Sequence, residues 1–239
     1  MPEITDQKKR KVVSGAGWLL SIIRRRFLLL FIFLLASLAL YPFAENTAFG
    51  YVAFRIAGSV AILLSVYAAS RRRDLIIWGM VLAIPALVQY LRILRFDAGL
   101  LSLSNISLSF TFDLFIVIVM FHRVFANEKR DAETVFGALC IYMMIALSFS
   151  SVYELVARLQ PHAFYLAPAT NTHAVLNRFD FIYYSFATMT ALGASGITAV
   201  SNQARSLTVI QAMLGIFYLA VLIARLMGAY RGGAVSRAD

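Results

Sequence analysis

The chain has 239 residues, of which 61% are hydrophobic and only 14% are charged, and its formal net charge is +10. This composition excludes an ordinary soluble domain and favours a protein that crosses the bilayer several times. The basic residues stand in short clusters between long apolar runs, so they indicate membrane topology and not a nucleic-acid surface. We therefore expect the lipid bilayer to be the main partner, and we expect no binding to nucleic acid.

A basic arm, residues 1–26, precedes the first apolar run. Its Lys and Arg clusters predict contact with anionic lipid headgroups. Trp18 indicates that residues 12–26 lie at the inner interface, either as an amphipathic helix or as an extension of the first span. The arm is polar and then basic, and no small-residue cleavage site follows it, so we expect no removed signal peptide.

Six apolar runs approach or exceed the roughly 20 residues that a helix needs to cross a bilayer. A shorter run, 179–192, has glycine just beyond its end, which is typical of a re-entrant segment. Backbone that turns back at membrane depth is tolerated only where protein or a water-filled cavity covers it. The sequence predicts an all-α membrane protein with six transmembrane helices plus a re-entrant pore helix and filter loop. The six runs lie at about 27–44, 51–70, 75–94, 105–121, 134–157 and 204–230.

Positive residues between these runs predict the orientation, because cytoplasmic loops are enriched in Lys and Arg. With the N-terminus inside, fifteen lie on the cytoplasmic side and five on the other, so both termini are predicted to be cytoplasmic. The inner set is Lys8, Lys9, Arg10, Lys11, Arg24, Arg25, Arg26, Arg71, Arg72, Arg73, Arg123, Lys129, Arg130, Arg231 and Arg237. The outer set is Arg92, Arg95, Arg158, Arg178 and Arg205.

These boundaries divide the chain into a four-helix peripheral domain, 27–125, a pore domain, 134–230, and a short cytoplasmic tail, 231–239. The connection 158–180 becomes an external turret ahead of the re-entrant segment. The tail is too short for a cytoplasmic ligand-binding domain, so we expect no gating by nucleotide or calcium through such a domain.

Residues 134–230 resemble the pore module of bacterial potassium channels in the order and spacing of their motifs. That family has a pore helix reading roughly Tyr-Phe-Ser-Phe-x-Thr-x-Thr-Thr, a filter Thr-Val-Gly-Tyr-Gly-Asp, and then an inner helix. The pore-helix matches are Tyr184, Ser185, Phe186, Thr188 and Thr190, and the inner-helix matches are Gly215, 218–225 and Gly228. The resemblance implies a homotetrameric channel in a bacterial inner membrane that passes a monovalent cation, K⁺ or also Na⁺, without a cofactor.

The filter departs from the family pattern, because Ala191, Leu192, Gly193, Ala194, Ser195 and Gly196 stand in its register. A potassium filter directs backbone carbonyls at the ion, and residues with positive φ help to turn them inward. Gly193 can still adopt a positive φ, because it has no side chain. Ser195 replaces the second glycine and would be strained at positive φ, whereas Gly196 could supply a shifted turn. We predict a filter, with Thr190 at its inner end, that is wider or softer than that of a potassium channel.

Charges inside predicted spans indicate function or pairing, since an isolated charge is costly there. Arg55 and Asp113 have similar predicted depths, which favours a buried ion pair over a charge-transfer element of a voltage sensor. A sensor needs Arg or Lys at every third position of its fourth span, and 105–121 contains none.

Two further residues have two readings each. Glu154, near the external end of the fifth span, either supports the pore loop by a hydrogen bond or is a simple interfacial carboxylate. Gly215 is either a hinge of the inner helix or a site of close packing against the pore helix.

No catalytic or metal-binding pattern is present. His122, His162 and His173 lack metal-ligand spacing, and Cys140 stands alone in an apolar run, so we predict neither an enzyme nor a metal site. The competing hypothesis to a conducting channel is a modulatory or structural subunit that keeps the channel fold but does not conduct.

Overall fold

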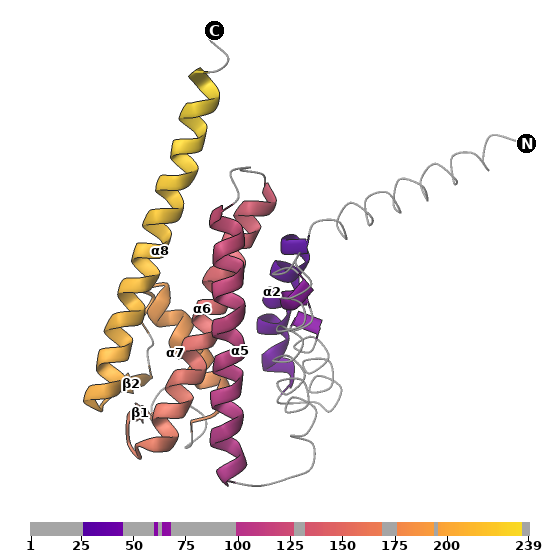
Figure 1. Ribbon diagram of the computed structural model, residues 1–239. Helices are drawn as coiled ribbons and strands as arrows, with labels where there is room; N and C mark the ends of the chain where they lie inside the picture. The colour runs from indigo at the N-terminus through magenta and orange to yellow at the C-terminus, as the bar shows by residue number, and fades with distance from the viewer. Residues whose placement is uncertain are drawn as a thin grey trace, which may run out of the picture.

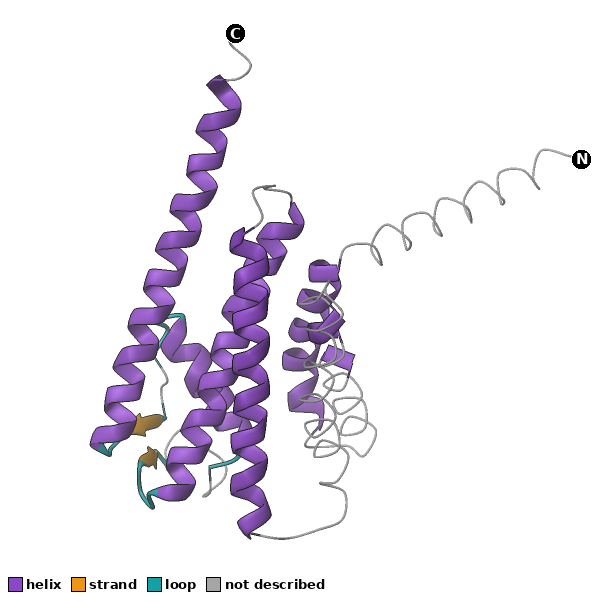
Figure 2. Ribbon diagram, in the orientation of Figure 1, coloured by secondary structure: helices purple, strands orange, loops and turns teal. Residues whose placement is uncertain are grey.

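The computed structural model describes residues 26–44, 60–61, 64–67, 99–126, 132–168, 176–193 and 196–235. The described part is mostly helical, and the helices lie side by side with α8 at one edge and α2 at the other (Figures 1 and 2). In chain order, its elements are α2 (Arg26–Ala44), α5 (Gly99–Ala126), α6 (Ala132–Leu159), β1 (Phe164–Leu166), α7 (Arg178–Met189), β2 (Ile197–Ala199) and α8 (Asn202–Val235).

Three described helices are long and apolar enough to cross a membrane, and they correspond to the fourth, fifth and sixth predicted runs. The crossing stretches are Ile106–Ala126, Glu133–Leu159 and Asn202–Arg225. The first predicted run forms a shorter apolar stretch, Arg26–Leu40. The predicted second and third spans, which include Arg55, lie for the most part outside the described residues, as do residues 1–25 of the basic arm.

A core of aliphatic side chains joins α2, α5 and α6. Leu30, Ile116, Met120 and Ile141 are each fully buried in it. Gly137 of α6 lets the helices approach closely, because a Cβ there would lie 2.8 Å from a methyl carbon of Val124 and 3.3 Å from the Phe27 ring. Small residues at such crossings are typical of membrane helices, whose association depends on close packing.

The prediction of an all-α protein was wrong in one detail, because the turret forms a small antiparallel sheet. Strand β1 pairs with β2, which follows the filter, with Phe164 opposite Ala199 and Leu166 opposite Ile197. The amides of Ala167 and Val200 extend the pairing to Gly196 and Ala163, each at 2.8 Å. Aromatic and β-branched residues favour this extended conformation. The sheet therefore ties the segment before the pore helix to the segment after the filter.

Candidate ion-conduction site

The short helix α7 begins at a strong sequence signal. Asn177 is its N-cap: the Asn177 side chain accepts from the Asp180 amide at 3.0 Å, and the Asp180 carboxylate accepts from the Asn177 amide at 2.7 Å. This capping box satisfies two amides that would otherwise lack a partner. It fixes the start of α7 in the loop that follows the turret.

Helix α7 is too short to cross a bilayer. Its 12 residues span about 18 Å at the usual rise, against a hydrocarbon core of about 30 Å. It packs against both α6 and α8, and Figure 1 shows it beside these longer helices. A half-length helix followed by a loop that returns to the sheet of β1 and β2 has the form of a re-entrant segment, as the apolar pattern predicts.

An aromatic cluster holds the outer half of α7. Tyr153 of α6 and Phe164 of β1 meet Phe181 and Tyr184 of α7 in edge-to-face pairs, with ring centroids 5.0–5.7 Å apart. This is the geometry that aromatic quadrupoles favour. The cluster therefore joins α7 both to α6 and to strand β1.

A buried polar network joins α6, α7 and α8 deeper in the structure. The Tyr153 hydroxyl donates to Gln211 Oε1 at 2.6 Å, and Gln211 Nε2 donates to the Ser185 hydroxyl at 2.6 Å and to the Ser185 carbonyl at 3.1 Å. Ser185 in turn donates to the Ala146 carbonyl at 2.6 Å. Tyr153, Ser185 and Gln211 are fully buried, so each bond forms in a low dielectric, where an unmet partner would be costly.

Further contacts fix the inner end of α7. The Tyr142 hydroxyl donates to the Met189 carbonyl at 2.8 Å. Gly215 of α8 lies against the same carbonyl, so closely that a Cβ at Gly215 would collide with it. This supports the close-packing interpretation of Gly215. On the outer half, the Tyr184 and Thr208 hydroxyls share a hydrogen bond of 2.8 Å.

The first filter positions form a helix-capping turn. After the C-cap Thr190, the Ala191 amide donates to the Thr188 carbonyl at 3.2 Å and the Leu192 amide to the Ala187 carbonyl at 2.9 Å. This is the bonding of a Schellman motif, in which the residue after the cap is left-handed and usually glycine. Ala191 occupies that position with φ 57°, so it carries backbone strain.

The glycines of the loop adopt conformations that other residues disfavour. Gly193 has φ +80° and Gly196 has φ +102°. The strain predicted at Ser195 is not tested, because Ala194 and Ser195 lie outside the described residues. The Thr190 hydroxyl donates to the Phe186 carbonyl at 2.8 Å and thus caps its own helix. Leu192 is 73% exposed, so this loop finds little cover within one chain.

An open cavity of about 610 Å³ lies behind the loop. Arg205, in the first turn of α8, lines it and donates from Nε to the Ala199 carbonyl at 3.2 Å. The walls of the cavity are formed by Tyr184, Ala187, Thr188, Ala191, Gly193, Ile197, Thr198, Ala199, Arg205, Thr208 and Val209.

Two further predicted site residues, Glu154 and Asp113, lie within the described part of the chain. Glu154 accepts a hydrogen bond from Arg158, one turn later in α6, at 2.8 Å, which favours the interfacial carboxylate over a pore-loop support. Asp113 of α5 is partly buried. The predicted pair with Arg55 falls outside the described residues.

The principal supports of the pore helix that the sequence analysis did not identify are Tyr142, Tyr153, Thr208 and Gln211. Gln211 carried a usable signal, because an amide in an apolar span must find a partner. The tyrosines carried none, since aromatic residues are common at membrane interfaces whatever their role. Within the described residues, no group of three or more His, Cys, Asp or Glu could hold a metal ion.

Substituting Gly193 by alanine tests the loop without disturbing packing, because a Cβ there would meet nothing within 4 Å of the same chain. We expect the strained φ to lower the free energy of unfolding by only about 1 kcal/mol. Ion flux should fall at least tenfold, since the carbonyl orientation depends on this φ. Flux into liposomes and unfolding in mixed micelles measure the two effects. Unchanged flux would show that Gly193 does not shape the conduction path.

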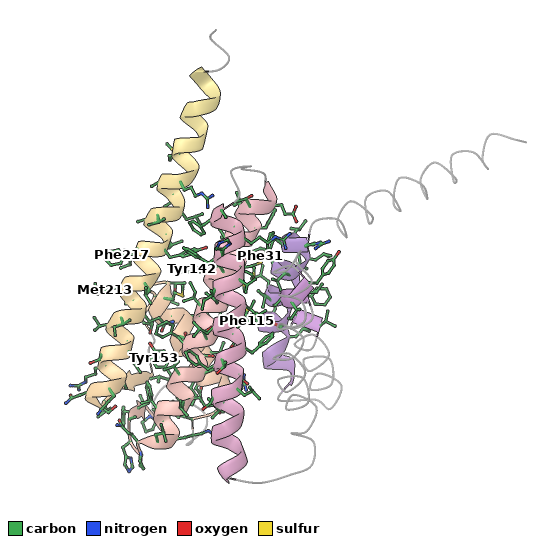
Figure 3. All side chains as sticks on the ribbon, viewed as in Figure 1. Phe31, Phe115, Tyr142, Tyr153, Met213 and Phe217 are labelled. Atoms are coloured by element: carbon green, nitrogen blue, oxygen red, sulfur yellow. The ribbon has the colours of Figure 1, made fainter. Side chains whose placement is uncertain are left out.

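The outward face of α8 is apolar and is left uncovered by the other described residues. Val209, Met213, Ile216 and Phe217 are each half exposed or more. Figure 3 shows Met213 and Phe217 on the side of α8 that faces away from the other helices. Such a surface requires lipid or protein around it.

A re-entrant helix and loop between two membrane-crossing helices define the pore-loop class of membrane proteins. Residues 136–231 match the protein family described as ion channel. The match covers the region whose motifs resemble the potassium-channel pore module and confirms that resemblance, and the ion channel match together with the apolar helices supports an integral membrane protein. No curated protein and no solved structure matches the chain.

Proposed function

We propose that this chain is the subunit of a homotetrameric cation channel that mediates passive flux of K⁺, and to a lesser degree Na⁺, across a bacterial inner membrane. The observation that carries the proposal is the direction of α7. Its C-terminal end leads directly into the glycine-containing loop. The end of a helix macrodipole carries about half a negative charge there, which favours a cation at the loop.

Weak selectivity follows from the loop itself. Selective filters replace the water shell of the ion with several rings of backbone carbonyls. Here the amides of Ala191, Leu192 and Gly193 turn back to carbonyls of α7. The residues at these positions cap the helix, so fewer of them are available for a straight row of ion sites.

Tetramer assembly accounts for the surfaces that one chain leaves open. Copies of α8 around a central axis would cover its apolar outward face, and neighbouring loops would meet at the exposed Leu192. Both termini lie on the cytoplasmic side in this arrangement, and the basic arm contacts anionic lipid. The permeant ion is the only ligand required, so no cofactor takes part.

Restoring the family filter tests this proposal. The variant carries Ala191→Thr, Ala194→Tyr, Ser195→Gly and Gly196→Asp. We expect the permeability ratio of K⁺ to Na⁺ to rise about tenfold or more, because an aromatic ring at position 194 can brace the filter and a glycine at position 195 can adopt the positive φ that the family filter uses. Reversal potentials in planar bilayers with KCl on one side and NaCl on the other measure the ratio. An unchanged ratio in a protein that conducts would contradict the filter assignment.

The second candidate is a subunit that keeps the channel fold without conducting. The capping turn at Ala191 favours it, since this turn departs from the straight row of carbonyls of a selective filter, and the Thr190 hydroxyl donates within its own helix. In that case, the native chain would give no current, whereas the restored filter would give a K⁺-selective one.

A further inference from the structure

One arginine of α8 reaches the end of another helix. Arg225 donates from Nη1 to the Val124 carbonyl at 3.1 Å and from Nη2 to the Phe125 carbonyl at 2.9 Å. Its guanidinium carbon lies 4.6 Å from the centroid of the Phe125 ring. Helices α5 and α8 otherwise make little contact, so this side chain is the main bridge between them in the described part of the chain.

The acceptors are suited to a cation. Val124 and Phe125 lie in the last turn of α5, which ends at Ala126. Carbonyls there lack helical partners and carry the negative end of the dipole. The forked guanidinium binds two of them together, which the single ammonium of lysine cannot do. An arginine at the end of an apolar stretch is stable when its donors are satisfied in this way.

The bridge lies at the cytoplasmic end of α8 as the topology predicts it. Tyr218, two turns before Arg225, donates to the Ala138 carbonyl of α6 at 2.6 Å and anchors the preceding part of α8. The end of α5 is itself packed on α2 and α6 around Gly137. Arg225 therefore connects the inner half of α8 to the peripheral helices and not only to the pore domain.

We propose that Arg225 is a latch that couples the cytoplasmic end of the pore-lining helix to the peripheral helix α5 and so sets the balance between closed and open pores. This inference rests on the proposed channel function. Movement of the inner half of α8 changes its distance from α5, so the latch can form fully in only one of the two states. A contact made in one state alone shifts the equilibrium by its own free energy.

The electrical test compares Arg225→Gln with the native chain in planar bilayers. We expect the open probability to change about tenfold, equivalent to the loss of roughly one charge-assisted bond, with unitary conductance within about twofold because the filter is untouched. Arg225→Lys should give an intermediate open probability. The control is Arg123→Gln, which removes a positive charge from the same end of α5, where Arg123 lies over the Phe27 ring at 5.1 Å. Equal effects of both Gln variants, or no effect of either, would overturn the latch.

A measurement of the distance between α5 and α8 tests the inference even if the protein passes no current. Spin labels are placed at Ile118→Cys and Met227→Cys, both more than half exposed, in a Cys140→Ser background, and the labelled chain is diluted with unlabelled copies. The distance distribution should broaden or shift on Arg225→Gln and stay unchanged on Arg123→Gln. A change without any current would support Arg225 as the link that holds α8 to α5, while the proposed channel function fails. An unchanged distribution would overturn the latch.

Discussion

Replacing Gly215 by alanine is expected to lower the free energy of unfolding by about 1–3 kcal/mol, as overpacking of a filled site does. The added Cβ would collide with the Met189 carbonyl and lie 3.0 Å from the Met189 Cγ. That carbonyl cannot move away freely, because Tyr142 holds it from α6. The inner end of α7 and the loop behind it must therefore shift, and ion flux should fall with stability. Reversible unfolding in mixed micelles measures the change.

Whether Gly215→Ala lowers or raises the free energy of unfolding distinguishes close packing at Gly215 from a hinge. If Gly215 served only to let α8 bend, alanine would stabilise the helix by about 1 kcal/mol and leave the pore helix in place. Gly137→Ala is the matched control, because its Cβ would press on a methyl of Val124 instead of a backbone group, and we expect a smaller loss. A stabilised Gly215→Ala variant would contradict the packing interpretation.

Replacing Gln211 by leucine is expected to destabilise the pore domain by about 2 kcal/mol, since it leaves the buried Tyr153 hydroxyl without its acceptor and removes two donors to Ser185. Interhelical hydrogen bonds in membranes average less than this, but these groups are fully buried, so bulk solvent cannot replace the amide. The same variant should alter permeability ratios, because Ser185 lies in the helix that carries the loop. Unfolding in mixed micelles and bi-ionic reversal potentials report the two effects.

A double-mutant cycle measures the interaction energy between Tyr153 and Gln211. Tyr153→Phe alone should cost about 1–2 kcal/mol by leaving Gln211 Oε1 unpaired, and Tyr153→Phe combined with Gln211→Leu should cost less than the sum of the two single changes, because no orphaned hydroxyl remains at Tyr153. Thr208→Val serves as a comparison, since it removes the hydrogen bond to the Tyr184 hydroxyl and leaves the Gln211 side chain in place. Strictly additive costs would show that Tyr153 and Gln211 act independently.

The order of elements in the pore domain could be predicted because each has a local signal. The length of an apolar run separates α7 from α6 and α8, and the Asn177 to Asp180 spacing gives the start of α7. The spacing of Tyr184, Ser185 and Gly215 then indicates the family. None of these inferences requires knowledge of which helices face one another.

The pairings across helices could not be predicted, because they depend on the rotation of each helix. Support of the pore loop was one of two roles predicted for Glu154, yet its neighbour Tyr153 bonds Gln211 while Glu154 pairs with Arg158. A shift of one residue turns a helical side chain by about 100°. Likewise, the turret strands depend on two segments separated by the whole of α7, and the strain at Ala191 depends on how that helix ends.

The most direct test of the central claim is cation flux through the purified protein in liposomes loaded with K⁺, measured with and without an imposed gradient. We predict gradient-driven K⁺ efflux, slower exchange with Na⁺, and no exchange with a large impermeant cation. Absence of any flux, in vesicles where the protein is shown to be folded and assembled as tetramers, would contradict the channel account and favour the non-conducting subunit.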